Sequence, residues 1–325
     1  MAIKAPESET QVGKGVEFSY YPGCSLHSTA REFNDSIQAI FKALGIKLVE
    51  LEDWNCCSAA SATTLNHALS LALPGRNLAI AQKSGRDMVI PCTGCYNRHK
   101  TTEFELRHGH SSNRALIEES VGFKYQGNFE VRSLLDVVGN QIGLENVRQH
   151  VQKPLTGLKV VGYYGCLLLR PTEITQFENP ENPTLLNELL RTLGADVQPW
   201  SYASDCCGGD QTLVKPDIAV RLVNRLVDRA QEAGAQAMVT VCPLCQMSLE
   251  MRQTVPPKAA GPSALPKAAG PSAPPMAAGP SAAGAKMPLF YFTELIGLAF
   301  GLEEAQSWWK KHLISPVSLL RSVGL

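Results

Sequence analysis

Ten cysteines in two sets with the same internal order constrain the fold of this chain more than any other feature of its sequence. Each set begins with a single cysteine, continues with an adjacent pair and ends with a CxxC motif, and 34 residues separate the pair from that motif in both sets. The first set is Cys24, Cys56, Cys57, Cys92 and Cys95, and the second is Cys166, Cys206, Cys207, Cys242 and Cys245. The residues around the cysteines repeat as well, since "YYPGC" (20–24) corresponds to "YYGC" (163–166) and "MVIPCTGC" (88–95) to "MVTVCPLC" (238–245). The chain is therefore expected to be a tandem repeat of two homologous modules.

Strand-like runs alternate with helical patterns in both modules. Strands are expected at 16–21, 46–51, 87–91, 158–164, 195–200 and 237–241, and helices at 28–45, about 63–83, 183–194 and about 216–233. This alternation predicts an α/β fold of tandem duplicated cysteine-rich modules, each a small, mostly parallel sheet flanked by helices. Each cysteine group follows a strand, so the loops at the carboxyl edge of each sheet are expected to bring one, two and two thiols together.

Composition and repeats suggest where the modules begin and end. The expected division is a disordered N-terminus (1–15), a first module (16–100), a helical connection (101–157), a second module (158–252), an Ala/Gly/Pro-rich linker (253–286), and a C-terminal strand and helix that complete the second module (287–325). In the linker, AAGPSA occurs three times at a nine-residue period, a composition that buries little apolar surface. A helix that docks a partner is the alternative for the last segment.

Nothing in the sequence suggests that the cysteines form structural disulfides. The first residues lack the apolar core of a secretion signal, and no apolar run approaches the roughly 18 to 20 residues of a membrane helix. A cytoplasmic protein without a transmembrane segment is expected, and its thiols would stay reduced. Lys plus Arg and Asp plus Glu each total 30, so no nucleic-acid partner is expected.

The thiols instead indicate metal binding. A structural zinc ion uses four ligands and has no evident use for a fifth thiolate, so five thiolates per module favour a multi-iron cluster. An adjacent pair lets one loop bind two metal atoms of the same cluster. Neither a ferredoxin motif nor a GxGxxG loop is present, so electrons are expected to come from, or go to, another subunit. A metal-stabilised scaffold remains the non-enzymatic alternative.

These motifs resemble the CCG-domain family of cysteine-rich proteins, in particular the B-type subunit of heterodisulfide reductase and its heterodisulfide reductase-like relatives in sulfur oxidation. The resemblance rests on "YYPGCSLHSTAREFNDSIQAIFKALG", "NCCS", "PCTGCYNRH", "GYYGCLLLRP", "DCCGGD", "VCPLCQMSLEM" and "PLFYFTELIGLAFGL". It implies that each five-cysteine set holds one non-cubane 4Fe-4S cluster. One departure is that Ser58 follows the first pair, where Gly208 completes the CCG of the second; serine is less permissive of a positive φ, so the geometry of the first site is less secure.

The resemblance also implies an activity and partners. The expected function is disulfide/thiol or carrier-bound sulfane redox chemistry, with the second set, Cys166, Cys206, Cys207, Cys242 and Cys245, as the catalytic one. The Ala/Gly/Pro-rich insertion is typical of GC-rich bacterial coding and favours dissimilatory sulfur oxidation. Expected partners are a ferredoxin-like, C-type subunit with cubane 4Fe-4S clusters, an A-type flavin subunit, and a small thiol/disulfide or lipoyl-type carrier. The alternatives are an electron-transfer subunit of a quinone-linked succinate, glycolate or lactate dehydrogenase, and methanogenic reduction of the CoM-S-S-CoB disulfide.

Two residues beside the cysteines are further candidates. His27 and Arg170 follow the first cysteine of each set by three and four residues, where they could bind an anionic substrate or donate a hydrogen bond to sulfur. The other histidines considered, His99, His108, His110 and His312, lack the spacing of a helical metal pair and are expected on the surface.

Overall fold

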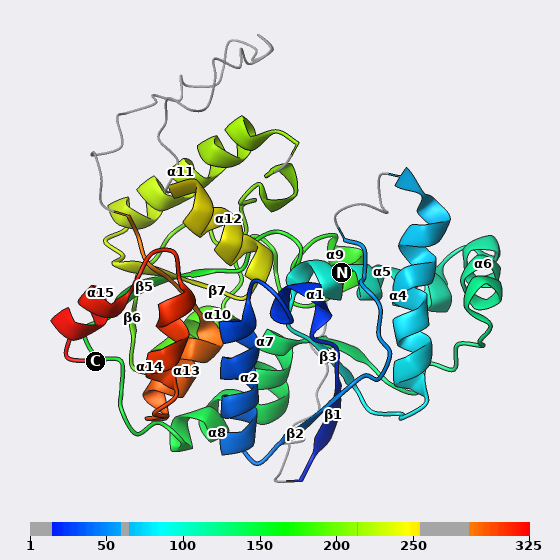
Figure 1. Ribbon diagram of the computed structural model, residues 1–325, viewed down its shortest axis with the longest axis horizontal. Helices are drawn as coiled ribbons and strands as arrows, with labels where there is room; N and C mark the ends of the chain where they lie inside the picture. The colour runs from blue at the N-terminus through cyan, green and yellow to red at the C-terminus, as the bar shows by residue number, and fades with distance from the viewer. Residues whose placement is uncertain (1–14, 60–64, 213, 254–285) are drawn as a thin grey trace.

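The protein contains two parallel sheets of four strands each (Figure 1). The computed structural model describes residues 15–59, 65–212, 214–253 and 286–325. The first sheet has the order β2-β1-β3-β4 and the second β6-β5-β7-β8, and every neighbouring pair is parallel. The strands are β1 (Glu17–Tyr20), β2 (Lys47–Glu50), β3 (Met88–Ile90), β4 (Val131–Ser133), β5 (Lys159–Tyr163), β6 (Asp196–Val197), β7 (Ala237–Thr240) and β8 (Leu289–Tyr291). The predicted α/β fold with two repeated parallel sheets is confirmed.

Helices cover both sheets. Those of the first half are α1 (Gly23–Leu26), α2 (Arg31–Ala43), α4 (His67–Gln82), α5 (Thr93–His108), α6 (Ser111–Val121), α7 (Leu134–Asp136), a π-helix (Val137–Gly143) and α8 (Leu144–Gln149). Those of the second half are α9 (Thr172–Thr175), α10 (Leu185–Thr192), α11 (Pro216–Glu232), α12 (Pro243–Gln253), α13 (Phe292–Ala299), α14 (Ala305–Trp308) and α15 (Val317–Ser322), with 3-10 turns at Gly209–Gln211 and Trp309–Lys311. Helix α2 shows why they form, because its buried Phe33, Ile37, Ile40 and Phe41 recur at helical spacing.

The segment between the cysteine sets contains a strand as well as the expected helices. Strand β4 pairs with β3 and completes the first sheet, as β8 pairs with β7 and completes the second. At three residues, β4 is too short to show a period in the sequence. Residues 1–14 of the expected disordered N-terminus and 254–285 of the expected linker lie outside the described residues.

The two halves interlock through the helices that follow the fourth strands. Helix α13 of the C-terminal segment packs on α2 of the first half, where the rings of Phe33 and Tyr291 stack 4.1 Å apart and the hydroxyls of Ser36 and Thr293 lie 2.6 Å apart (Figure 1). In the reciprocal contact, α10 of the second half packs on the π-helix and α8. One hydrophobic core therefore includes residues of both modules.

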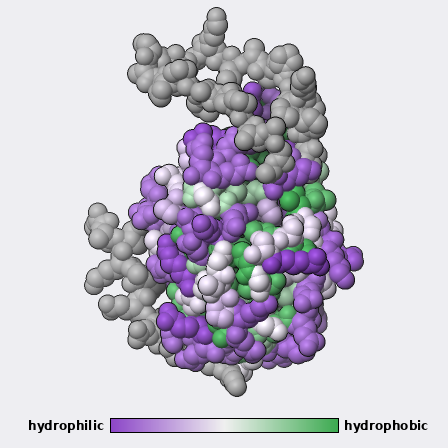
Figure 2. Space-filling model, turned by 90° about the vertical axis from the view of Figure 1, so that its left-hand side faces the viewer, coloured by the Kyte–Doolittle hydropathy of each residue, from purple (hydrophilic) through white to green (hydrophobic). Residues whose placement is uncertain are grey.

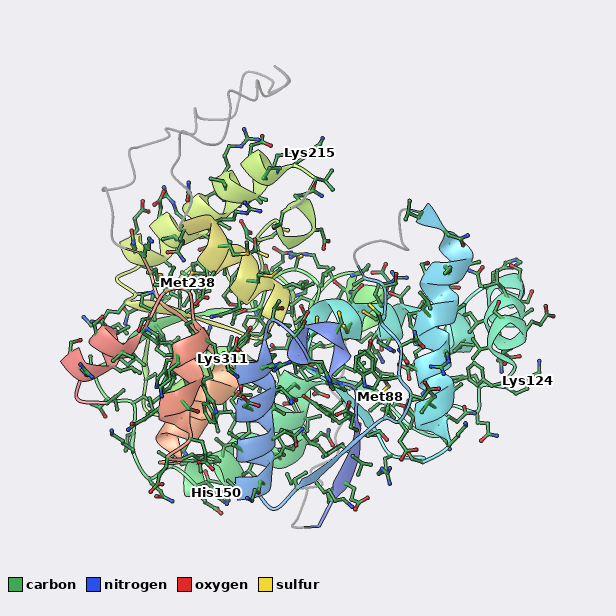
Figure 3. The ribbon with its side chains drawn as sticks, viewed as in Figure 1. Met88, Lys124, His150, Lys215, Met238 and Lys311 are labelled. Carbon is green, nitrogen blue, oxygen red and sulfur yellow. The ribbon has the colours of Figure 1, made fainter. Side chains whose placement is uncertain are left out.

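The repeat extends to single positions in the core. Met88 in β3 and Met238 in β7, both labelled in Figure 3, precede the CxxC motifs by the same four residues, and both are fully buried. Equal spacing therefore places equivalent side chains in both sheets.

No helix among the described residues is long and apolar enough to span a bilayer. The molecular face in Figure 2 mixes hydrophilic side chains with smaller hydrophobic areas.

Candidate metal centre

All ten cysteines lie beyond the carboxyl ends of strands, as the sequence predicts. In the first half, Cys24 lies in α1 after β1, the pair Cys56 and Cys57 follows β2, and Cys92 and Cys95 follow β3 at the start of α5. The second half repeats this arrangement after β5, β6 and β7. Parallel strands end at one edge of a sheet, so each set is delivered to one edge by three loops.

Within the first set, the thiols are in contact. The Sγ atoms of Cys57 and Cys95 lie 3.0 Å apart, and Cys24 and Cys56 are near enough to shift each other's pKa. Gly23 leaves room for this approach, since a Cβ added there would lie 3.2 Å from the Sγ of Cys95. None of the ten cysteines forms a disulfide.

The second set has the same contacts. The Sγ atoms of Cys207 and Cys245 lie 3.4 Å apart, and Cys166 and Cys206 are near enough to shift each other's pKa. A Cβ added at Gly165 would lie 3.0 Å from the Sγ of Cys245. Both sets are therefore built on the same plan.

The two sets also meet each other. The two CxxC motifs lie against each other, since a Cβ added at Gly94 of the first would lie 3.4 Å from Leu244 of the second, and Cys92 and Cys242 shift each other's pKa. Helix α5 fixes this junction, because the side-chain amide of Asn97 donates to the carbonyls of Leu167 and Arg170 at 3.0 and 2.8 Å. The ten thiols therefore form one group shared by both modules.

The first cysteine of each adjacent pair lies on the open side of this group. Cys24, Cys56 and Cys206 are exposed, Cys166 is half-buried, and the other six thiols are buried. Hydrogen bonds from neighbouring thiols, Cys24 and Cys166 respectively, lower the pKa of Cys56 and Cys206 from the ordinary thiol value. Thiolate is the form that binds metal, so the first cysteine of each pair is prepared as a ligand within reach of solvent.

A repeated tyrosine holds each of these paired-cysteine loops. The hydroxyl of Tyr21 donates to the carbonyl of Asn55 at 2.9 Å, and that of Tyr163 donates to the carbonyl of Asp205 at 2.7 Å. Asn55 and Asp205 directly precede the pairs. The matching "YY" segments show in the sequence that the tyrosines are repeated. The hydrogen bonds that they donate could not be predicted from it.

Ser58 adopts the backbone conformation of the glycine that it replaces. Its φ is +57°, close to the +70° of Gly208, and both backbone N–H groups donate to the sulfur of the first cysteine of the pair at 3.3 Å. The first loop therefore keeps the geometry of the second, and serine bears the strain of a left-handed conformation.

Glycine at position 58 is predicted to relieve this strain. Ser58→Gly is expected to stabilise the protein by about 1 kcal/mol, since glycine adopts a positive φ freely but loses more entropy on folding. Gly208→Ser is the matched variant, and it should destabilise by more than that, because a Cβ at Gly208 would lie 3.0 Å from the backbone Cα of Ala219. Urea unfolding of the two variants beside the wild type measures both effects. A less stable Ser58→Gly protein would show that the serine side chain itself supports the loop.

His27 and Arg170 both have partners outside the cysteine sets. His27 is half exposed, its Nε2 lies 3.1 Å from Glu50, and its ring packs edge-on against Trp54. Arg170 forms an ion pair with Glu181 at 2.5 Å and lies 3.4 Å from the carbonyl of Ser204. Their suggested roles beside a cluster stay predictions.

The expectation of surface histidines is correct for His108 and His110 and wrong for His99 and His312. His99 is fully buried one turn after Cys95, its Nδ1 lies 2.7 Å from the Cys95 carbonyl, and the amide of Asn77 lies 3.1 Å from its Nε2. Burial lowers the pKa of His99 to about 4, so the ring is neutral and its Nδ1–H donates to that carbonyl. Tertiary packing buries both rings, and no sequence spacing indicates it.

The donor set fits iron–sulfur clusters. Each set places five cysteines at one sheet edge, and thiolates are the usual ligands of such clusters. Within the described ranges, no group of three or more His, Cys, Asp or Glu side chains is arranged for a single metal ion. The fit therefore rests on the converging thiols and on the glycines that leave room beside them.

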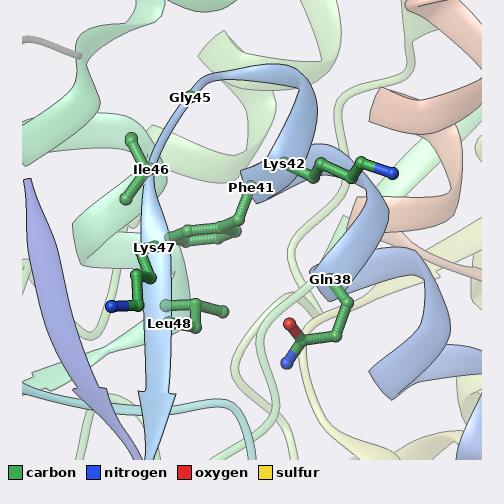
Figure 4. A pocket seen from close by; sticks show the side chains of 7 residues that line it. All are labelled: Gln38, Phe41, Lys42, Gly45, Ile46, Lys47 and Leu48. Atoms are coloured by element: carbon green, nitrogen blue, oxygen red, sulfur yellow. The ribbon is translucent and has the colours of Figure 1, made fainter. Parts of the chain in front are cut away.

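A surface pocket elsewhere is unrelated to this chemistry (Figure 4). It is lined by Gln38, Phe41, Lys42, Gly45, Ile46, Lys47 and Leu48. These residues lie where α2 ends and β2 begins, so the pocket is at the amino end of β2, opposite to the end that leads to the cysteines.

Comparison with known proteins identifies the family. The CCG cysteine-rich domain matches the chain twice, over residues 18–98 and 160–250, and the chain belongs to this family. The chain is 31% identical over 303 residues to the 8-methylmenaquinol:fumarate reductase membrane anchor subunit of Wolinella succinogenes, covering 93% of this chain and 99% of that protein. The family and its relatives confirm the predicted resemblance and imply iron–sulfur clusters.

Two further relatives are named after heterodisulfide reductase. The chain is 27% identical to a protein of Archaeoglobus profundus that is named as similar to the B-type subunit of heterodisulfide reductase, over 73% of this chain and 82% of that protein. It is 23% identical to the B-type subunit of the ferredoxin/F420H2-dependent CoB-CoM heterodisulfide reductase of Methanosarcina acetivorans, over 95% and 97%. A crystal structure of a hypothetical protein from Helicobacter pylori has a similar fold, with a TM-score of 0.64 and 10% identity; the match covers 91% of this chain and 51% of that one. By name, the sequence relatives are oxidoreductase subunits.

Proposed function

We propose that this chain is the catalytic iron–sulfur subunit of a heterodisulfide reductase-like complex. Each five-cysteine set would hold one non-cubane 4Fe-4S cluster, and each cluster would supply or take up one electron of a two-electron reaction at sulfur. The approach of the two CxxC motifs carries this proposal, because Gly94 of the first lies against Leu244 of the second and the two one-electron sites would be neighbours. Cleavage of a disulfide into two thiols, or the reverse, requires two electrons.

The chain's own residues would bind the clusters and leave one side open. The buried thiols hold the inner side of each set, whereas the exposed Cys56 and Cys206 lie where a sulfur substrate would approach. Cys166, Cys206, Cys207, Cys242 and Cys245 are the proposed catalytic set. Tyr21 and Tyr163 position the paired-cysteine loops through the preceding carbonyls.

The proposed substrate is a disulfide, a thiol or carrier-bound sulfane sulfur of a lipoyl type, in cytoplasmic dissimilatory sulfur oxidation. Proposed partners are a ferredoxin-like subunit with cubane clusters and a flavin subunit, which would carry electrons to or from the junction. The B-type relative from a methanogen makes the CoM-S-S-CoB disulfide a further candidate of the same chemical class.

A quinone-linked role is the second candidate. The observation that favours it is the 31% identity to the membrane anchor of an 8-methylmenaquinol:fumarate reductase, a value above those of the two heterodisulfide reductase relatives described here. In that role the same two sites would pass electrons between a quinone and a dehydrogenase partner.

One set of measurements on anaerobically purified holoprotein separates these functions. Iron, acid-labile sulfide and zinc per chain are measured first, and electron paramagnetic resonance spectra are then recorded before and after addition of a thiol or of a menaquinol analogue. Abundant iron and sulfide with a thiol-dependent signal supports sulfur chemistry. Reduction by the quinol analogue without a thiol response supports the quinone-linked role, and zinc alone overturns both.

Cys207→Ala tests the catalytic set in particular. Disulfide or sulfane turnover should be lost, because a buried ligand of the proposed catalytic set is removed, while the first set stays able to bind iron. Turnover at the wild-type rate in this variant would contradict the assignment. Cys57→Ala is the matched variant for the first set.

A further inference from the structure

The equal spacing of the two sets allows position-by-position comparison of their surroundings. From the cysteine pair to the helix after the CxxC motif, each residue of the first half has its counterpart 150 positions later, as for Cys57 and Cys207 or Cys92 and Cys242. Arg98 thus corresponds to Ser248, and His99 corresponds to Leu249. The cysteines occur at matching positions in the two sets, whereas the charged side chain Arg98 of the first half has an uncharged counterpart in the second.

Arg98 is a cation without a carboxylate partner in the described part of the chain. Its Nη2 donates to the backbone carbonyl of Ser70 at 3.1 Å, and its Nε is buried without a hydrogen-bond partner. The guanidinium interacts electrostatically with Cys57, while burial lowers its pKa. A partly buried charge is costly unless an anion compensates it, and arginine stays protonated in proteins. The anion that can compensate the charge of Arg98 is the first set of thiolates.

The position of the second set that corresponds to Arg98 carries no charge, and the nearby Arg170 and Arg252 bind Glu181 and the carbonyl of Thr212. The hydroxyl of Ser248 donates to the carbonyl of Cys207 at 3.0 Å and brings no charge. Asp210, three residues after Cys207, acts electrostatically on Cys206 and Cys242, and no ion pair joins its carboxylate to a cation among the described residues. The other nearby carboxylate, Asp205, is paired with Arg225.

We propose that Arg98 makes the first cluster easier to reduce than the second, so that the first electron to enter the protein rests at the N-terminal site. This inference rests on the proposed function, in which each set holds one cluster. Reduction adds a negative charge, which the cation beside the first set stabilises and the carboxylate beside the second set opposes. Arg98 therefore acts on the reduction potential of the first cluster and determines which cluster is reduced first.

Potentiometric titration of the holoprotein, followed by electron paramagnetic resonance, tests this order. The Cys57→Ala and Cys207→Ala variants assign the signals to the two sites. In the wild type, the first cluster should be reduced at the higher potential. A second cluster that is reduced first, or two clusters with the same potential, would overturn the inference without any further variant.

Arg98→Gln removes the charge and keeps an amide that can donate to Ser70. The ratio of reduced to oxidised first cluster at a fixed potential should fall about tenfold or more, and a tenfold change is about 59 mV for a one-electron couple. The second cluster should be unchanged, and Arg98→Lys should restore most of the ratio. A structural role alone would not produce rescue by charge.

Asp210→Asn provides an independent test beside the second set. Loss of this carboxylate should make the second cluster easier to reduce and leave the first unchanged. Wild-type potentials in both Arg98→Gln and Asp210→Asn, with full iron content, would contradict this inference and leave the proposed function standing. Lack of iron and sulfide in the wild type would instead contradict the proposed function.

Discussion

Replacement of His312 by leucine is expected to destabilise the protein by about 3 to 5 kcal/mol, the usual cost of removing one partner of a buried ionic group. The His312 side chain is only 1% exposed, its Nε2 lies 2.9 Å from Glu294, and its Nδ1 lies 3.4 Å from Glu250. Both glutamates are buried. Leucine would leave two buried carboxylates, one on α12 and one on α13, without their cation. Urea unfolding at neutral pH measures the loss.

His108→Leu is the matched control for this effect. His108 is exposed at the end of α5, so its replacement should change stability by less than about 0.5 kcal/mol. An equal effect of the two substitutions would show that the buried ionic group contributes nothing particular.

The same group predicts how stability depends on pH. Burial lowers the pKa of His312, but the charges of Glu294 and Glu250 outweigh it and raise the pKa to about 10. In the unfolded chain the pKa is near 6.5, so the folded state holds this proton more tightly. The stabilisation is complete below about pH 6.5 and is lost as the pH rises through about 10. The difference in stability between wild type and His312→Leu should therefore shrink over this range, and a constant difference would contradict the assignment.

Local patterns were sufficient to predict the fold and the position of the cysteines after its strands. The repeated cysteine order, with strand-like runs before each group, predicted two parallel sheets whose carboxyl edges carry the thiols. The period of α2 predicted its buried face. Strand β4 was missed because three residues in a largely helical segment show no period.

Contacts between distant segments could not be predicted in this way. The spacing within each set says nothing about the distance between the sets, so the approach of the two CxxC motifs to each other had no sequence signal. Burial of His99 and His312 depends on the packing of α4 against α5 and of the C-terminal segment against α12. The sequence did mark Ser58 as unusual, and only the backbone shows that it keeps the glycine conformation.

Gly165→Ala is expected to prevent the second set from holding its cluster while the first set remains intact. Gly165 has a φ of +69°, and a Cβ there would lie 3.0 Å from the Sγ of Cys245, so the added methyl group would occupy the space in which the thiols converge. Cys245 is buried and cannot turn out to solvent. The purified variant should carry roughly half of the wild-type iron and acid-labile sulfide, because one of the two thiolate sets is blocked.

The control must separate this steric effect from backbone strain. Gly157→Ala imposes the same backbone strain, since Gly157 has a φ of +85°. Its added Cβ, however, would meet no atom closer than Val323 at 3.9 Å. This variant should lose stability and keep its full iron content. Gly23→Ala, whose Cβ would lie 3.2 Å from the Sγ of Cys95, should block the first set instead. Full iron in Gly165→Ala would show that the space beside the thiols is not needed, and equal iron loss in Gly157→Ala would show that backbone strain causes the loss.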